Sequence, residues 1–481
     1  MDLVKKLKGY QTMSPPLKAS LWYTVCNVLL KGMALLATPI FTRIMTQDQY
    51  GSYSIFMSWY NILFIAATLN LNLSSYNKGL INYKEQVNAF TSSQLGLCMA
   101  LTTLLLIVYL LFREFFTQIL GMTPLLMAAM FGLLYTTPAT EFWAAWERYN
   151  FKYKKFVVIT ISTTVLSIVI GLLAVISTEQ KTEAKVFSET LVRALIGLAI
   201  FIVLMSRGKC VFKWEYWKYG LLFNLPLIPH YLSTYVLNQA DRIMIGNMAG
   251  NSQAAMYSVA YTISTMTMLV VSGVNNSLVP YIYKSIHTGE QGNIKKNTAP
   301  LFALMAGMCI LVMCFAPEVI LVFAGKAYMD AIWVIPPITA SVYFIFVYSM
   351  YSTIEYYYQK TGRVAVASCV AAGANIVLNY VCIKLFGYHA AGYTTLACYI
   401  LLALMHYIFY RGVVRKELPE NKDLYDLRTI LLFSGLLLLV MIAMVLTYRW
   451  ALIRYGIVSV LAVVALLNRK RIMGMLKLKN L

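Results

Sequence analysis

Charged side chains are scarce in this sequence. Only 12% of its 481 residues are Asp, Glu, Lys or Arg, whereas 60% are hydrophobic, and the mean hydropathy is +0.67. Soluble globular domains carry about 25% charged residues. The scarcity of charge excludes a water-soluble protein and indicates an integral membrane protein.

Sequence motifs for catalysis are also lacking. There is no GxxxxGK(S/T) phosphate loop and no HExxH motif, and the four histidines lie in separate segments. The eight cysteines occur singly, without CxxC spacing, so they indicate neither disulfides nor a metal site. The polar loops are too short to hold a catalytic domain. We therefore predict that the protein is not an enzyme and uses neither a metal nor another cofactor.

Long apolar segments recur along the whole chain instead. A helix needs roughly 20 apolar residues to cross a membrane. We predict an all-α polytopic membrane protein with about 14 transmembrane helices. The predicted spans are 19–41, 52–76, 90–112, 122–146, 156–177, 186–206, 216–240, 254–280, 298–324, 331–357, 364–386, 390–411, 427–448 and 450–468.

The distribution of Lys and Arg predicts the topology. If the N-terminus is cytoplasmic and the spans alternate, 29 of the 40 basic residues lie inside and 9 outside, with Lys31 and Arg193 within spans. Short cationic loops resist translocation, so both termini are predicted to be cytoplasmic. The formal net charge of +21 is explained by loops that face anionic lipid headgroups, and we predict no nucleic-acid partner.

An internal repeat indicates two related halves. Arg-Ile-Met followed by Tyr-Ser recurs, with Arg43 and Arg242 199 residues apart and Tyr53 and Tyr257 204 residues apart. Each half would hold six spans and run in the same direction, with a pathway between the halves. We predict pseudo-symmetric six-helix lobes over 1–210 and 211–415, followed by two apolar helices and a basic tail over 416–481.

Polar side chains form a stripe along corresponding spans of the two halves. At 100° per residue, one face of the second span carries Asn61 and Thr68, and one face of the eighth span carries Tyr261, Thr265, Ser272 and Asn276. We predict that both stripes line a substrate cavity. The alternative, that these side chains form hydrogen bonds between neighbouring helices, stays open.

Basic and titratable residues extend the predicted cavity. Lys31 lies near the middle of the first span on the same face as Asn27, and the repeat offset places His230 at the corresponding depth of the seventh span. Arg193 lies inside the sixth span. A cation inside a membrane needs water, a partner or a substrate. A structural ion pair remains the alternative for Lys31.

Three acidic residues are candidates for ion coupling. Glu141 and Glu355 lie toward the predicted cytoplasmic ends of the fourth and tenth spans, and Asp241 shares a helix face with His230. Either glutamate could carry a coupling proton or neutralise Lys31 or Arg193.

Two segments resemble a known family. PIFTRIMTQDQYGSYSIFMSW (39–59) and NQADRIMIGNMAGNSQAAMYSVAYTIS (238–264) look like the matching segments of the Wzx-type polysaccharide-biosynthesis flippases, which belong to the multidrug/oligosaccharidyl-lipid/polysaccharide exporter superfamily. The resemblance implies a bacterial inner-membrane protein whose two lobes form a V-shaped cavity.

The same resemblance implies the cargo and the partners. The cargo would be an undecaprenyl-diphosphate-linked oligosaccharide repeat unit, for O-antigen or another surface polysaccharide, turned from the cytoplasmic to the periplasmic leaflet. Membrane lipids and a polysaccharide polymerase complex would be its partners. Relatives that flip the peptidoglycan precursor carry more arginines in the cavity, which makes that precursor a less favoured cargo here. A drug/cation antiporter of the same superfamily and a membrane-embedded transferase remain as alternative functions.

Overall fold

The structure is a computed structural model of the whole chain, and it describes residues 13–73, 75–418 and 423–467. All regular secondary structure in these residues is helical. By its contacts the chain divides into two compact units, unit 1 (residues 1–235) and unit 2 (residues 236–481). The division falls within α11 (Ile228–Ala249). The predicted lobe boundary at residue 210 stays a prediction.

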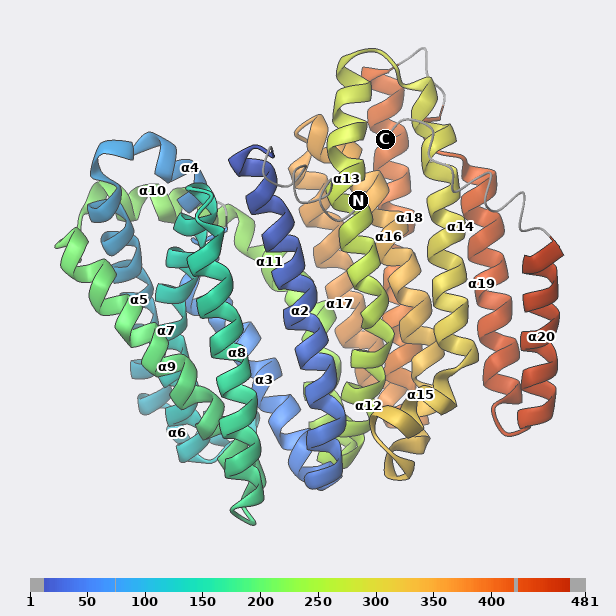
Figure 1. Cartoon of the computed structure of the whole chain (residues 1–481), viewed down its shortest axis with the longest axis horizontal. Helices are drawn as coiled ribbons and strands as arrows, with labels where there is room; N and C mark the ends of the chain where they lie inside the picture. The colour runs from blue at the N-terminus through green and yellow to red at the C-terminus, as the bar shows by residue number, and fades with distance from the viewer. Residues whose placement is uncertain (1–12, 74, 419–422, 468–481) are drawn as a thin grey trace, which may run out of the picture. The chain divides into compact units, whose positions relative to one another are not determined.

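Unit 1 is built around α9, which contacts α5, α7 and α8 (Figure 1). The helices of this unit are α2 (Pro15–Ile44), α3 (Gln47–Thr68), α4 (Ser75–Asn82), α5 (Val87–Leu111), α6 (Arg113–Leu120), α7 (Pro124–Tyr149), α8 (Tyr153–Ile176), α9 (Lys181–Gly208), α10 (Trp214–Asn224) and the first part of α11. Close packing of α9 requires a glycine, because a Cβ at Gly197 would lie 2.7 Å from the carbonyl oxygen of Thr136 in α7.

Unit 2 is built around α16, the most buried of its membrane-spanning helices, which contacts α12, α14, α18 and α19. Its helices after α11 are α12 (Asn251–Ser264), α13 (Met268–His287), α14 (Gly292–Cys314), α15 (Ala316–Phe323), α16 (Ile335–Tyr357), α17 (Thr361–Phe386), α18 (Ala390–Glu417), α19 (Leu427–Thr447) and α20 (Ala451–Leu467).

Local signals in the sequence explain how α2 gives way to α3. Thr46 and Gln49 form a reciprocal capping box: the Thr46 hydroxyl accepts from the Gln49 backbone N–H at 3.2 Å, and Gln49 Oε1 accepts from the Thr46 N–H at 3.0 Å. This arrangement satisfies two backbone donors that the start of a helix leaves free. The tight connection brings α2 and α3 together, and both helices contribute to the site described below.

Ten helices in the described residues are long and apolar enough to cross a membrane, or eleven if the pair α6 and α7, bent by 92°, counts as one span. The chain is therefore a multi-pass all-α membrane protein, as the sequence predicts. Most residues of each of the fourteen predicted spans are helical, but the count of fourteen stays a prediction.

Several predicted spans are interrupted. In the span predicted over 52–76, α3 ends at Thr68 and a turn follows before α4 begins at Ser75. The span predicted over 216–240 breaks at a 3-10 turn, Leu225–Leu227, which contains Pro226, a residue that cannot donate a helical hydrogen bond. The span predicted over 254–280 contains a 3-10 turn at Thr265–Thr267 within the continuous helical segment Asn251–His287, and the one over 298–324 is divided between α14 and α15. Continuous hydropathy conceals such breaks, because it reports burial in lipid rather than the direction of the backbone.

Candidate functional site

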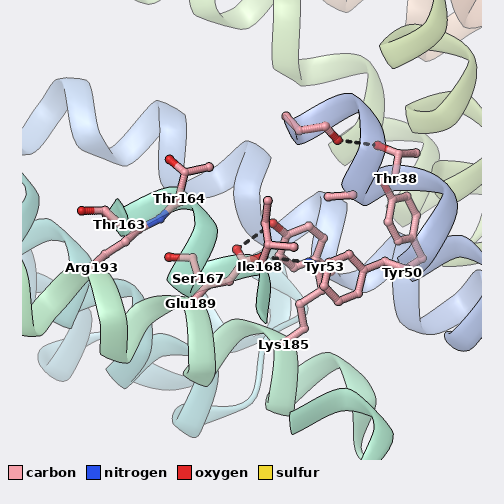
Figure 2. Close-up of a pocket in the computed structure, with 13 residues that line it drawn as sticks. Thr38, Tyr50, Tyr53, Thr163, Thr164, Ser167, Ile168, Lys185, Glu189 and Arg193 are labelled. Carbon is pink, nitrogen blue, oxygen red and sulfur yellow. Dashed lines mark hydrogen bonds and ion pairs between the residues drawn. The ribbon is translucent and has the colours of Figure 1, made fainter. Parts of the chain in front are cut away.

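A charged cavity lies inside unit 1, between α2, α3, α8 and α9 (Figure 2). Its volume is about 180 Å³. The lining includes aromatic rings from α2 and α3, hydroxyl groups from α8 and charged groups from α9: Phe41, Tyr50, Tyr53, Thr163, Thr164, Ser167, Lys185, Glu189 and Arg193.

The charged groups share one face of α9 because of their spacing. Lys185, Glu189 and Arg193 are four residues apart, so each lies about one turn beyond the last. Lys185 Nζ donates to Glu189 Oε1 at 2.8 Å, and both side chains are largely buried. The pair takes part in a network that includes neighbouring helices.

Aromatic side chains complete the surroundings of Lys185. The Tyr53 hydroxyl donates to the second oxygen of Glu189, Oε2, at 2.9 Å. The ammonium of Lys185 lies 3.2 Å from the centre of the Phe41 ring and 4.4 Å from that of Tyr53, a cation–π arrangement. Lys185 therefore has its charge compensated by one carboxylate and two aromatic faces.

Arg193 occupies the other side of the cavity. Figure 2 shows it extended away from Lys185, toward the side that Thr163 and Thr164 line. Within the described residues its guanidinium forms no hydrogen bond or ion pair, although it interacts electrostatically with Glu189. Nearby, the buried hydroxyl of Ser167 has no hydrogen-bond partner in the described structure. Two cations and one carboxylate give the cavity a formal charge of +1, so it suits a hydroxyl-rich anion.

The other predicted site residues of unit 1 do not line this cavity. Lys31 and Asn27 are exposed on α2, and Lys31 lies one turn before Ala34, which lines the cavity. Asn61 and His230 are half-buried outside the lining, and Thr68 is buried, with its hydroxyl donating to the carbonyl oxygen of Phe64 at 2.7 Å.

In unit 2 the predicted stripe is split between internal contacts and exposed positions. The Tyr261 hydroxyl donates to Asn238 Oδ1 at 2.7 Å, and the Thr265 hydroxyl donates to the carbonyl oxygen of Tyr261 at 2.8 Å. Ser272 and Asn276 are exposed. The predicted stripe of the eighth span thus has different environments before and after the 3-10 turn Thr265–Thr267.

Asp241 lies at the centre of a buried polar cluster in unit 2. Its carboxylate accepts from the Asn379 amide at 2.5 Å, from the Thr395 hydroxyl at 2.7 Å and from the Tyr257 hydroxyl. The Asn379 amide also donates to Asn375 Oδ1 at 3.2 Å. The side chains come from α11, α12, α17 and α18, so a carboxylate with no exposed surface joins four helices.

The two glutamates predicted for ion coupling have other partners. Asn72 donates to Glu141 Oε2 at 3.3 Å, and Glu355 Oε1 lies 2.8 Å from His406 Nδ1 in a fully buried pair. Within unit 1, the carboxylate that interacts with Arg193 is Glu189 rather than Glu141. The hypothesis that Glu141 or Glu355 carries a coupling proton, or neutralises Lys31 or Arg193, stays a prediction.

The sequence of residues 17–286 matches the family of polysaccharide biosynthesis proteins. The chain belongs to this family. It is also 25% identical, over 160 residues, to protein 1 of the Lsg locus of Haemophilus influenzae, and the match spans 32% of this chain and 39% of that protein.

Solved structures share the fold at low sequence identity. The lipid II flippase MurJ in an inward closed conformation is 14% identical, with a TM-score of 0.67 over 94% of this chain and 99% of the other. An inward-facing multidrug resistance MATE family transporter is 14% identical, with a TM-score of 0.64 over 80% and 94%. A MOP superfamily transporter from Pyrococcus furiosus is 15% identical, with a TM-score of 0.55 over 84% and 97%. These likenesses confirm the fold predicted from the sequence.

Sequence reasoning identified Arg193 but missed Lys185, Glu189 and Tyr53. The sixth span is predicted to begin at residue 186, which leaves Lys185 in a loop, whereas α9 begins at Lys181 and includes it. Three charges at i, i+4 and i+8 on one helix were the available signal. The contribution of Tyr53 depends on how α3 packs against α9, which no local pattern encodes.

Proposed function

We propose that this protein is a flippase that moves a polyprenyl-diphosphate-linked oligosaccharide from the cytoplasmic to the periplasmic leaflet of a bacterial inner membrane. The observation that carries the proposal is the cavity of unit 1, with its net positive charge and its hydroxyl-rich wall. Membership of the polysaccharide biosynthesis family supports a saccharide cargo. The name of the structural relative MurJ, a lipid II flippase, supports a lipid-linked one.

The chemistry of the cavity suits the diphosphate. A diphosphate diester carries a negative charge on each phosphate, and arginine binds phosphate oxygens through two parallel N–H donors. We propose that Arg193 makes this contact, while Thr163, Thr164 and Ser167 offer hydroxyl groups to the first sugar. Lys31, one turn along α2 from the lining residue Ala34, would attract the anion before it enters.

Asp241 is the proposed ion-coupling residue. It is a buried carboxylate surrounded by hydroxyl and amide groups from four helices, so a change in its charge state would alter contacts among all of them. Ion coupling requires that the charge state of one residue shift the equilibrium between two arrangements of the packed helices.

A drug/cation antiporter is less well supported. A cation as cargo would meet Arg193 and the compensated Lys185 in the cavity of unit 1, and like charges repel in a site of low dielectric constant. The charge of the cavity therefore favours an anionic cargo.

The proposal is tested by transport in a bacterial strain whose own copy of the gene is deleted. Arg193→Gln should lower surface polysaccharide about tenfold or more, because it removes charge-assisted hydrogen bonds worth about 1.5–3 kcal/mol, and lipid-linked repeat units should accumulate. Arg193→Lys should retain part of the activity, and Lys31→Ala should show a smaller loss. Arg113→Gln, at an exposed arginine of α6, is the matched control. Normal polysaccharide in Arg193→Gln at normal membrane abundance would refute the role of Arg193.

A further inference from the structure

A second cavity in unit 1 lies where α7 ends and α8 begins, and the proposed transport does not use it. Its volume is about 300 Å³. It is lined by α4, α5, α7, α8 and α9, and the lining includes two tryptophans, one glutamate and two basic residues: Trp143, Trp146, Glu147, Lys155 and Arg207. None of these residues contributes to the cavity that holds Arg193.

Glu147 is the unusual member of this lining. Only 6% of its surface is exposed, and its Oε2 atom is buried without a hydrogen-bond partner in the described structure. Its backbone is fixed, because its carbonyl oxygen accepts from the Tyr23 hydroxyl at 3.1 Å and from the Lys152 N–H at 2.9 Å. A buried carboxylate oxygen that lacks a donor is costly, so its retention points to a donor from outside the chain.

The other polar groups deep in this cavity have partners. The hydroxyls of Tyr76 and Thr91 lie 2.7 Å apart and satisfy each other. Lys155 and Arg207 are both exposed at the entrance, and within the described residues neither forms an ion pair. The cavity thus presents an unsatisfied carboxylate inside and two available cations outside.

The surroundings are those of a membrane interface. Tryptophan and basic residues gather at the depth of lipid headgroups, and here they lie at the ends of α7, α8 and α9. The faces of tryptophan rings also attract ammonium groups. A ligand that fits carries an ammonium group a few bonds from a phosphate.

We infer that this cavity binds the headgroup of an aminophospholipid, with the phosphate at Lys155 and Arg207 and the primary ammonium at Glu147 beside Trp143 and Trp146. A phosphatidylethanolamine headgroup has these two charges in this order. A choline headgroup has no N–H to donate to Glu147, and a glycerol headgroup has no positive charge. The inference concerns a site separate from the cargo cavity and does not depend on the identity of the cargo.

The test measures lipid retention by the purified full-length protein. Native mass spectrometry after exchange into equimolar phosphatidylethanolamine, phosphatidylcholine and phosphatidylglycerol should show about tenfold preferential binding of phosphatidylethanolamine, as expected for one charge-assisted hydrogen bond. Glu147→Gln should reduce this preference to less than about twofold. Glu85→Gln, at an exposed glutamate of the same unit, should keep it.

Three results of this exchange experiment would overturn the inference. They are equal retention of the three lipids by the natural protein, a preference for phosphatidylglycerol, and an unchanged preference in Glu147→Gln. Because a change at buried Glu147 can impair folding, Lys155→Gln provides a second measurement at an exposed position: retention of all three phospholipids should fall several-fold, and unchanged retention would also contradict the inference. Displacement of the lipid by an equal concentration of free phosphoethanolamine would rule out a membrane lipid as the ligand.

Discussion

Replacing one partner of the buried Lys185–Glu189 pair should destabilise unit 1 far more than replacing both. Lys185 is only 3% exposed, and its ammonium lies 2.8 Å from the carboxylate. Removing one partner of a buried ion pair costs about 3–5 kcal/mol, because the other charge stays buried without compensation. Glu189→Gln is expected to reach this range, since Lys185 then loses its counter-charge and keeps only a neutral amide oxygen and the rings of Phe41 and Tyr53.

The two single variants should not be equivalent. In Lys185→Met the remaining Glu189 still accepts from the Tyr53 hydroxyl and still interacts with Arg193, so the loss of stability should be smaller than in Glu189→Gln. The thioether of methionine also packs well against aromatic rings. The double variant should lie within about 1–2 kcal/mol of the natural protein, far less than the sum of the two single losses, so the coupling energy between the two residues is large.

The assay is equilibrium unfolding of the purified protein in mixed micelles by SDS, followed by circular dichroism. An exposed ion pair serves as the matched control: Lys213 Nζ and Glu215 Oε2 are 3.3 Å apart, with side chains 41% and 58% exposed, so Glu215→Gln should cost less than about 1 kcal/mol. If the Lys185 and Glu189 variants were additive within about 0.5 kcal/mol, the compensation inferred from the structure would be wrong.

Two further predictions concern topology and coupling. Reporter fusions after Lys152 and after Lys416 should read as cytoplasmic and one near Glu183 as periplasmic; a periplasmic signal at Lys416 would contradict the predicted helix parity. Asp241→Asn should preserve membrane abundance but abolish transport, because it removes the charge and keeps the shape. Asp241→Ala should also lower abundance, since it leaves the buried donors of Asn379 and Thr395 unpaired at about 1–3 kcal/mol each. Full transport by Asp241→Asn would refute the coupling role.

Membrane class, helical fold and family could be predicted from the sequence. Hydropathy and helix length depend only on local composition, so they can be read from the sequence. The segments that indicate the family, 39–59 and 238–264, are continuous in the sequence and lie on α2–α3 and α11–α12. The 3-10 turns at Leu225–Leu227 and Thr265–Thr267 could not be predicted from hydropathy, because the apolar run continues through each of them.

The polar stripes were a weaker guide to the site than the charges. Thr68 and Thr265 each donate to the carbonyl oxygen one turn earlier in their own helix. A hydroxyl that is satisfied within its own helix can lie on any face, so periodicity alone does not distinguish a cavity from a packed interface. Charged groups inside a membrane need a counter-charge, water or a ligand, which a backbone carbonyl does not replace. Their positions therefore carry more information about where a site lies.

The charge arrangement on α9 explains how a cationic cavity can exist in a membrane-spanning helix. Lys185 is compensated by Glu189 and by two aromatic faces, so it adds little to the attraction of an anion while fixing the carboxylate in place. Glu189 accepts from Lys185 and from Tyr53, and it forms no direct bond to Arg193 in the described structure. The formal charge of +1 therefore resides chiefly on Arg193, next to the hydroxyl groups of α8. For this reason the ion pair governs the stability of the cavity, whereas Arg193 governs what the cavity binds.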